Sequence, residues 1–250
     1  MISHLLLRWR TMLLLLILLS SQSIIIDAKI EQEDERSVTL PKRKVVKPLL
    51  DPIPMLPQVT HKVFLDVEIE DGDDSGGRIE LGLFGTHAPQ LVENFRALCA
   101  CDQGNGKRTK KPLCYKGSTF HRIITNFMIQ GGDFTHHDGT GGETIFGADI
   151  VDESFAVKHN RKFLLSSANK GRRNSNASQF FITTVKAQWL DDHHVVFGFV
   201  LSGEDVVQAI ERQGTNGGKP RQKITVVNSG VLELTAQEKL PIPVAQKIIA

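Results

Sequence analysis

The segment Phe120–Phe134, FHRIITNFMIQGGDF, restricts the fold more than any other part of the chain. Its residues alternate between two faces, as side chains on β-strands do, and Thr125–Asn126 divides it into two short strands. Both faces of both strands are largely apolar. The pattern predicts either strands buried on both sides, or strands with one face on a core and the other in a groove that a ligand fills.

Two long polar side chains within this segment bear on that choice. Arg122 and Gln130 lie among apolar residues, and arginine is rarely fully buried unless it is paired. Gly131–Gly132 follows, and glycine within a strand often marks a bulge or a close approach of another backbone. A ligand groove accounts for the two polar residues. The alternative is a core hairpin whose arginine extends to solvent.

Six further segments have the pattern of β-strands and are separated by turn signals. They are His61–Ile69, Arg78–Phe84, Phe163–Ala168, Gln179–Thr184, Val195–Leu201 and Lys223–Leu234. Two more segments have the periodicity of amphipathic helices, the first from Pro89 to Cys99 and the second from Glu204 to Arg212. Proline suits a helix start because its missing N–H would be unpaired there.

This series of elements predicts a mainly β fold. An eight-stranded antiparallel barrel, closed and capped by two α-helices, satisfies the number and order of the elements. The alternative from the pattern alone is an up-and-down barrel whose lumen holds a small molecule.

Residues 1–28 have the pattern of a secretory signal peptide. Arg8 and Arg10 precede the apolar run Met12–Leu19, and small residues follow it. The alternative is an uncleaved signal anchor, although Met12–Ile26 is shorter than the ~20 apolar residues of a membrane span. We therefore expect the secretory pathway: the lumen of the ER or Golgi, secretion, or membrane attachment if the segment is not cleaved.

The remaining boundaries follow from composition. Residues 29–58 are rich in charge and contain five prolines, a composition that predicts a disordered, extended linker. The prolines are Pro41, Pro48, Pro52, Pro54 and Pro57. The folded domain is expected over residues 59–234, and residues 235–250 are expected to form a C-terminal tail.

Charge and metal-ligand patterns exclude some function classes. The net charge is +2 and 40% of the residues are hydrophobic, which is typical of a globular protein and does not indicate a nucleic-acid partner. There is no CxxC pair, and the neighbouring histidines of His136–His137 and His193–His194 would point to opposite faces of a strand. We therefore expect no metal site and no cofactor.

The three cysteines are Cys99, Cys101 and Cys114. Cys101 and Cys114 stand at the two ends of one polar loop, and with a secretory leader this placement suggests a disulfide between them. Closing so short a loop would stabilise the fold by about 3 kcal/mol. The alternatives are a Cys99–Cys114 bond and three free thiols.

Several blocks of the sequence resemble the cyclophilins, the peptidyl-prolyl cis-trans isomerases that cyclosporin inhibits. They occur in the family's order, cover roughly residues 59–234, and together are far more specific than a lone motif. The blocks are VENFRAL (Val92–Leu98), YKGSTFHRII (Tyr115–Ile124), FMIQGGDFT (Phe127–Thr135), SQFFITT (Ser178–Thr184) and WLDDHHVVFG (Trp189–Gly198). The loop from Cys101 to Cys114 resembles the insertion of the divergent-loop subset of this family.

The resemblance implies a role for each residue of the site. Arg122 would donate a hydrogen bond to the proline nitrogen of a twisted amide, and Gln130 would orient Arg122 or contact the substrate backbone. Asn169 would bond the substrate main chain, Ala168 and Gly139 would form the rim, and Trp189 would contact cyclosporin. The residues that match the proline pocket are Phe127, Met128, Phe181, Leu190 and His194.

The expected function is therefore isomerisation of X–Pro bonds in proline-containing segments of secretory-pathway proteins, which assists their folding. The same resemblance implies binding of cyclosporin-type inhibitors, and a monomer is expected. One alternative is a non-catalytic module that only holds proline-containing peptides, but binding alone would not require Arg122. Another is a redox-responsive protein governed by its three cysteines.

Lys170, Arg172 and Arg173 depart from the family pattern in a loop beside the expected groove. The hypothesis from this departure is a preference for acidic residues next to the proline. A solvated charged rim is the alternative.

Overall fold

The computed structural model describes residues 56–70 and 76–238. The chain separates into two units, residues 1–51 and 52–250, and all described residues belong to the second. The expected leader, residues 1–28, and nearly all of the expected linker, residues 29–58, lie outside the described residues. Over the described ranges, no helix is both long and apolar enough to cross a bilayer.

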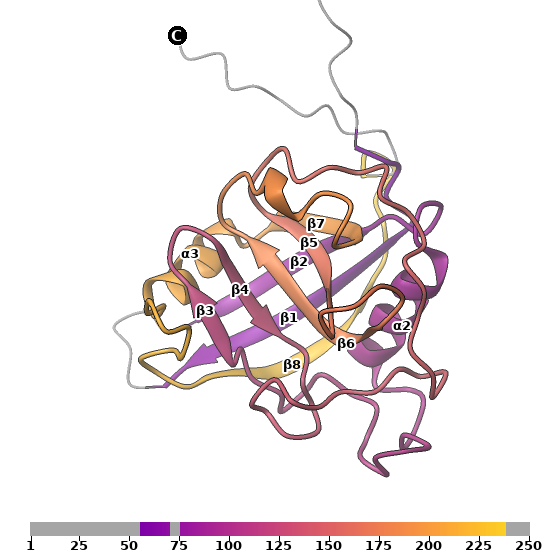
Figure 1. The fold of residues 1–250 in the computed structure, drawn as a ribbon, viewed down its shortest axis with the longest axis horizontal. Coiled ribbons are helices and arrows are strands. Elements are labelled where there is room, and N and C mark those ends of the chain that lie inside the picture. Colours follow the sequence, from indigo (N-terminus) through magenta and orange to yellow (C-terminus); the bar gives the residue numbers. More distant parts are fainter. Residues whose placement is uncertain (1–55, 71–75, 239–250) are drawn as a thin grey trace, which may run out of the picture. The chain divides into compact units, whose positions relative to one another are not determined.

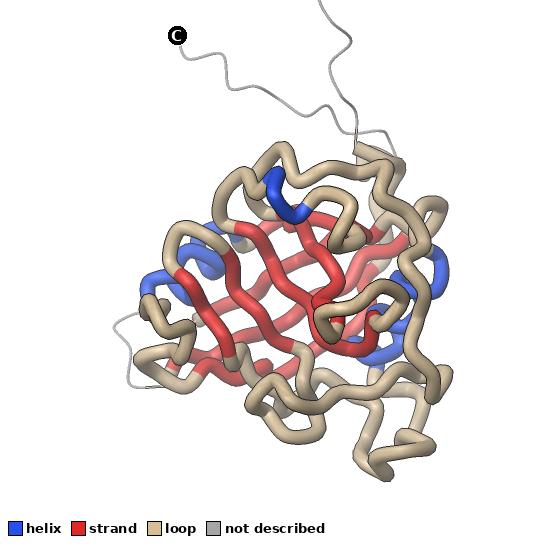
Figure 2. Tube along the Cα trace, in the orientation of Figure 1, coloured by secondary structure: helices blue, strands red, loops and turns tan. Residues whose placement is uncertain are grey.

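Eight strands form one antiparallel sheet in the order β3-β4-β6-β5-β7-β2-β1-β8 (Figure 1). The strands are β1 (His61–Ile69), β2 (Gly77–Leu83), β3 (Arg122–Ile124), β4 (Met128–Gly131), β5 (Leu164–Asn169), β6 (Asn176–Thr183), β7 (Val196–Ser202) and β8 (Ile224–Leu232). The helices are α2 (Pro89–Ala100), α3 (Glu204–Arg212) and a short 3-10 turn, η1 (Gln188–Leu190). The sheet curls strongly, so that its two halves cross in Figure 2.

The prediction of a closed barrel is wrong, although the strands, their antiparallel pairing and the two helices are as expected. The end strands β3 and β8 meet only through the residues before β3, where Phe120 N–H donates to Ile224 O at 3.0 Å. Along β3 itself, the outer edge is taken by a loop: Ile123 N–H donates to Gly218 O at 2.7 Å. Because β3 has only three residues and this loop occupies its edge, the sheet is a curled half-barrel.

The core lies between the curled sheet and the two helices, which stand at opposite ends of it (Figure 1). Helix α2 buries Leu91, Phe95 and Leu98, as its periodicity predicts. The Phe95 ring contacts three other rings, with centroid distances of 5.1 Å to Tyr115, 5.1 Å to Phe180 and 5.3 Å to Phe197. Such edge and tilted contacts are favoured by the ring quadrupole, so this aromatic cluster fixes α2 on the sheet.

A second, smaller cluster extends the packed part of the chain beyond the expected limits. Leu56, assigned to the linker from composition, is 4% exposed and packs in the cluster of Val59 and Phe84. At the other end, Glu238 in the expected tail pairs with Lys62 at 2.8 Å. Both ends of the described region are therefore fastened to the sheet.

The segment Phe120–Phe134 has one face on the core and the other open. Ile123 and Ile129 face each other across β3 and β4, and both are fully buried. Arg122 and Gln130 face each other on the open side. The hairpin turn is held from α3, where Glu211 accepts a hydrogen bond from Asn126 N–H at 2.7 Å. Of the two arrangements expected for this segment, the structure has the one with a single face on the core, and not the one buried on both sides.

The loop after α2 is cross-linked and anchored. A disulfide joins Cys101 to Cys114, with Cα atoms 4.5 Å apart, and Cys99 is free and buried. The carboxylate of Glu143 lies beneath the loop and accepts hydrogen bonds from Arg108 N–H at 2.8 Å and Thr109 N–H at 2.9 Å. A covalent bond at its ends and a buried carboxylate at its middle give this polar loop a defined path.

Candidate active site

Arg122 and Gln130 form the centre of the site. They are cross-strand neighbours, and Arg122 Nη1–H donates to Gln130 Oε1 at 3.3 Å. Gln130 Nε2–H in turn donates to Gln179 Oε1 at 3.0 Å, and Gln179 Nε2–H donates to Gly139 O and Gly141 O, each at 2.8 Å. This chain of amides fixes which end of Gln130 faces Arg122. A guanidinium on an exposed strand end is thereby held in one orientation.

Gln179 was not among the residues expected in the site. Its signal in the sequence is the period of strand β6, which places it on the same face as Phe181, two residues later. Phe181 is directly opposite Gln130 in the register, so all three side chains share one face. The alternation of β6 therefore already places Gln179 on the same face as Phe181. Only the pairing of β4 with β6 shows that Gln179 positions Gln130.

Expected apolar pocket residues lie beside Gln130 on this side of the sheet. Phe181 is 5% exposed and Met128 is 1% exposed, and they come from neighbouring strands β6 and β4. The ring of His194 is edge-on to Phe181 at a centroid distance of 5.2 Å. Leu190, at the end of η1, is partly buried, and its carbonyl oxygen accepts a hydrogen bond from His194 N–H at 3.1 Å. Expected pocket residues from three separate segments are thus brought together.

An exposed aromatic residue lies next to this group. Trp189 is 62% exposed, and its ring lies 5.6 Å from that of Phe127 in the turn before β4. An accessible aromatic pair of this kind offers a flat contact surface to a ligand.

The rim residues are also defined by their contacts. At the end of β5, the side chain of Asn169 donates to His193 O at 2.8 Å and accepts from Gly171 N–H at 3.1 Å. Ala168 precedes it and is partly exposed. Gly139 has a φ of +94°, and a Cβ there would lie 2.8 Å from the ring of His121, so this rim position requires glycine.

The histidine beside Phe181, His194, is neutral at neutral pH. Burial lowers the pKa of His194 below its usual value, although a backbone hydrogen bond opposes the shift. Its Nδ1 lies 3.0 Å from Ser167 O, and because a carbonyl only accepts, Nδ1 is the protonated nitrogen. His194 therefore presents a neutral ring to Phe181.

A second histidine, not expected from the sequence, supports Phe181 from behind. His159 is fully buried; its Nδ1 lies 2.9 Å from Asp191 Oδ1 and its Nε2 lies 2.9 Å from Ser166 Oγ. Burial lowers the pKa of His159 despite the opposing carboxylate. A neutral ring that donates to Asp191 and accepts from Ser166 satisfies all three groups.

The basic rim has internal partners. Lys170 Nζ lies 2.6 Å from Asp149 Oδ1, and Arg172 Nη2 lies 3.2 Å from Asp149 Oδ2. Arg173 lies over the ring of Phe155 at 5.4 Å. Asp149 thus pairs with two of the three cations and neutralises one of their three charges, so Lys170 and Arg172 are less available to an acidic substrate than unpaired cations would be.

One group of described residues has the composition of a cation site: Asp133, His136 and Asp138 lie close together. Both carboxylate oxygens of Asp133 already accept hydrogen bonds, Oδ1 from Thr135 and His136 and Oδ2 from Gly139 and Gly141. The buried carboxylate organises the loop that contains Gly139.

Comparison with known proteins agrees with this geometry. Residues 64–231 match the family described as cyclophilin type peptidyl-prolyl cis-trans isomerase/CLD. The chain is also 51% identical over 174 residues to a protein of Arabidopsis thaliana named peptidyl-prolyl cis-trans isomerase CYP21-1, an alignment that covers 69% of this chain and 76% of the relative. The chain therefore belongs to the cyclophilin family and is a peptidyl-prolyl cis-trans isomerase.

Proposed function

We propose that Arg122 is the catalytic residue of this isomerase and that Gln130 positions it. Rotation about an X–Pro bond requires the loss of amide resonance, with a barrier of about 18–20 kcal/mol. In the twisted amide the proline nitrogen regains a lone pair, to which a fixed guanidinium can donate a hydrogen bond. Such a contact accelerates the reaction because it exists in the transition state and not in the planar substrate. The observation that carries this proposal is the hydrogen bond between Arg122 and Gln130 beside Phe181, which is opposite Gln130 in the register.

The proline ring is proposed to occupy an apolar depression formed by the expected pocket residues. These residues are Phe127, Met128, Phe181, Leu190 and His194. His194 acts as a wall and not as an acid or base, because the reaction transfers no proton. The main chain of Asn169 would hold the extended substrate, with Ala168 and Gly139 at the rim. Trp189 would add contact area for substrates and for cyclosporin-type inhibitors.

The proposed substrates are proline-containing segments of proteins folding in the secretory pathway, and the proposed active form is a monomer. The leader pattern of residues 1–28 and the disulfide between Cys101 and Cys114 support this compartment, because disulfides persist where the environment is oxidising. A membrane location would follow if the leader remains attached.

An isomerisation assay tests the assignment of the pocket. The purified protein is assayed on a proline-containing peptide at increasing concentrations of cyclosporin, and binding of the inhibitor is measured separately by calorimetry. The proposal predicts that inhibition follows occupancy of a single site. Full activity at saturating inhibitor would place the reaction elsewhere and contradict it.

A further inference from the structure

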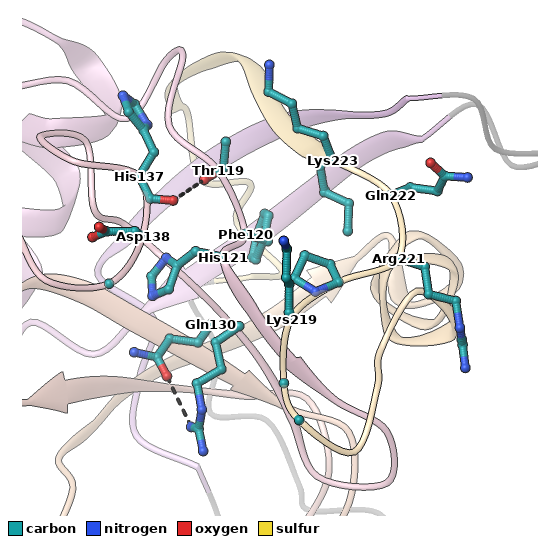
Figure 3. Close-up of a pocket in the computed structure, with 16 residues that line it drawn as sticks. Thr119, Phe120, His121, Gln130, His137, Asp138, Lys219, Arg221, Gln222 and Lys223 are labelled. Atoms are coloured by element: carbon teal, nitrogen blue, oxygen red, sulfur yellow. Dashed lines mark hydrogen bonds between the residues drawn. The ribbon is translucent and has the colours of Figure 1, made fainter.

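A second pocket adjoins the active site at Arg122. It has a volume of about 800 Å³ and lies between β3, the loop containing His137 and the segment 217–224 (Figure 3). It shares Arg122, Gln130 and Gly139 with the site described above, but none of the residues of the apolar depression. A substrate held at Arg122 therefore has this pocket directly beside it.

The lining of this pocket is strongly basic. Four cationic residues line it, against one acidic residue: the cationic ones are Arg122, Lys219, Arg221 and Lys223. The acid, Asp138, already accepts hydrogen bonds from Thr140 N–H at 2.9 Å and Thr140 Oγ–H at 2.6 Å. Lys219 and Lys223 form no ion pair with any carboxylate in the described ranges, in contrast to Lys170 and Arg172 at the opposite rim.

The segment that supplies these charges is held firmly. Gly218 O accepts the hydrogen bond from Ile123 of β3, and Lys219 O accepts one from Thr215 Oγ–H at 2.8 Å. Gly218 has a φ of +85°, and a Cβ there would lie 3.2 Å from Cγ of Arg122, so the segment approaches the arginine closely. Figure 3 shows the Lys219 side chain beside the segment, with His121 and Gln130 across the pocket. Fixing the backbone in this way reduces the entropy lost when a ligand binds.

We propose that this basic pocket binds the carboxylate of an acidic residue near the isomerised proline, and so gives the enzyme a preference for acidic substrates. The proposal rests on the proposed role of Arg122 at the proline. An extended peptide advances about 3.3–3.6 Å per residue, so we expect the acidic residue two or three positions from the proline, about 7–11 Å along the peptide. A partly exposed ion pair changes binding by a factor of about two to three, so pairs with both Lys219 and Lys223 predict an overall preference of about three- to tenfold.

The test compares pairs of peptides that differ only in Glu or Gln at one position, two or three residues before or after the proline. The full-length oxidised protein is assayed for kcat/KM on each pair. The expected result is that kcat/KM is about three to ten times higher for the Glu peptide than for the Gln peptide at one side of the proline. This ratio should fall as salt is added, because the charges are exposed. A ratio near one at every position would overturn the proposal.

Variants identify the pocket responsible. Lys219→Gln and the double variant with Lys223→Gln should bring the Glu/Gln ratio toward one. Lys116→Gln, an exposed lysine outside the pocket, and Lys170→Ala, at the opposite rim, should keep the ratio of the parent. A ratio that changes with Lys170→Ala and not with Lys219→Gln would contradict the assignment.

A final arm separates this proposal from the role of Arg122. If Arg122→Ala leaves activity on both peptides unchanged, the proposed catalytic residue is wrong. Binding of the Glu and Gln peptides to the parent and to Lys219→Gln, measured by calorimetry, then tests the basic pocket separately. Equal affinities of the parent for the two peptides would overturn the basic-pocket proposal, whatever the role of Arg122.

Discussion

The ring of His159 stacks on that of Phe181, with centroids 6.3 Å apart and planes 15° from parallel. Asp191 and Ser166 hold the histidine at its two nitrogens, so one wall of the proline pocket rests on a buried hydrogen-bond network. Because this support contains a titratable group, acidification should affect the pocket and the fold together.

Stability should decline in mild acid. Burial lowers the pKa of His159 below the 6.5 of an exposed histidine, so as pH falls the unfolded chain takes up a proton before the folded one. The contribution of neutral His159 is therefore complete above about pH 6.5 and is lost as the pH falls from there toward the folded pKa. Burial lowers the pKa values of His121 and His194 also, which adds to the same slope. Urea unfolding at pH 7.5 and 5 measures this loss, which should be smaller in His159→Gln. Equal or greater stability at pH 5 would contradict it.

The aromatic cluster around Phe95 should dominate the stability of the domain. Phe95 is 2% exposed and contacts three rings, so Phe95→Ala should lower the free energy of unfolding by about 3–5 kcal/mol. Denaturant titration measures this change. A loss below 1 kcal/mol would mean that the cluster relaxes around the cavity and does not fix α2.

Trp189, in contrast to Phe95, should contribute to ligand binding and little to stability. At 62% exposure its substitution by alanine should change the free energy of unfolding by no more than about 0.5 kcal/mol. The same change should weaken cyclosporin binding by about tenfold or more, as exposed aromatic anchors of interfaces do when truncated. Calorimetry on parent and variant measures the affinity. An unchanged affinity would remove Trp189 from the proposed contact surface.

The disulfide should stabilise the fold without taking part in catalysis. Its cysteines are 13 residues apart, and closing a loop of that size is worth about 3 kcal/mol. The double variant Cys101→Ser, Cys114→Ser should therefore unfold more easily but keep its isomerase activity, because Glu143 still anchors the loop.

Thiol counting provides the control for that prediction. Burial raises the pKa of Cys99 well above its usual value, so its thiol should be unreactive in the native protein. One thiol should appear when the oxidised protein is unfolded. Loss of activity on reduction would instead favour a redox-responsive function.

The sequence predicted local features well and distant contacts poorly. Alternation located the hairpin of Arg122 and Gln130, and the family blocks supplied Phe181 and Trp189. His159 and Asp191 are 32 residues apart, and no local period relates them. The pattern of β3 likewise gives no sign that Gly218 occupies its edge, which is why a closed barrel was expected.

The basic pocket was missed for the same reason. Lys219 lies in a segment with no strand or helix period, and Lys223 is the first residue of the predicted strand Lys223–Leu234. Only the approach of Gly218 to Arg122 shows that both lysines lie near the site. The sequence instead drew attention to Lys170, whose departure from the family pattern is visible locally. Its partner, Asp149, is 21 residues away and was not predicted.

The most direct test of the account is the isomerase activity of Arg122→Ala, with Arg122→Lys alongside and with peptide affinity measured for both. A hydrogen bond from a charged donor is worth about 1.5–3 kcal/mol, so Arg122→Ala should lower kcat by about ten- to a hundredfold. Peptide affinity should change little, and Arg122→Lys should recover only part of the rate because it lacks the planar guanidinium. An unchanged kcat in Arg122→Ala would contradict the central claim.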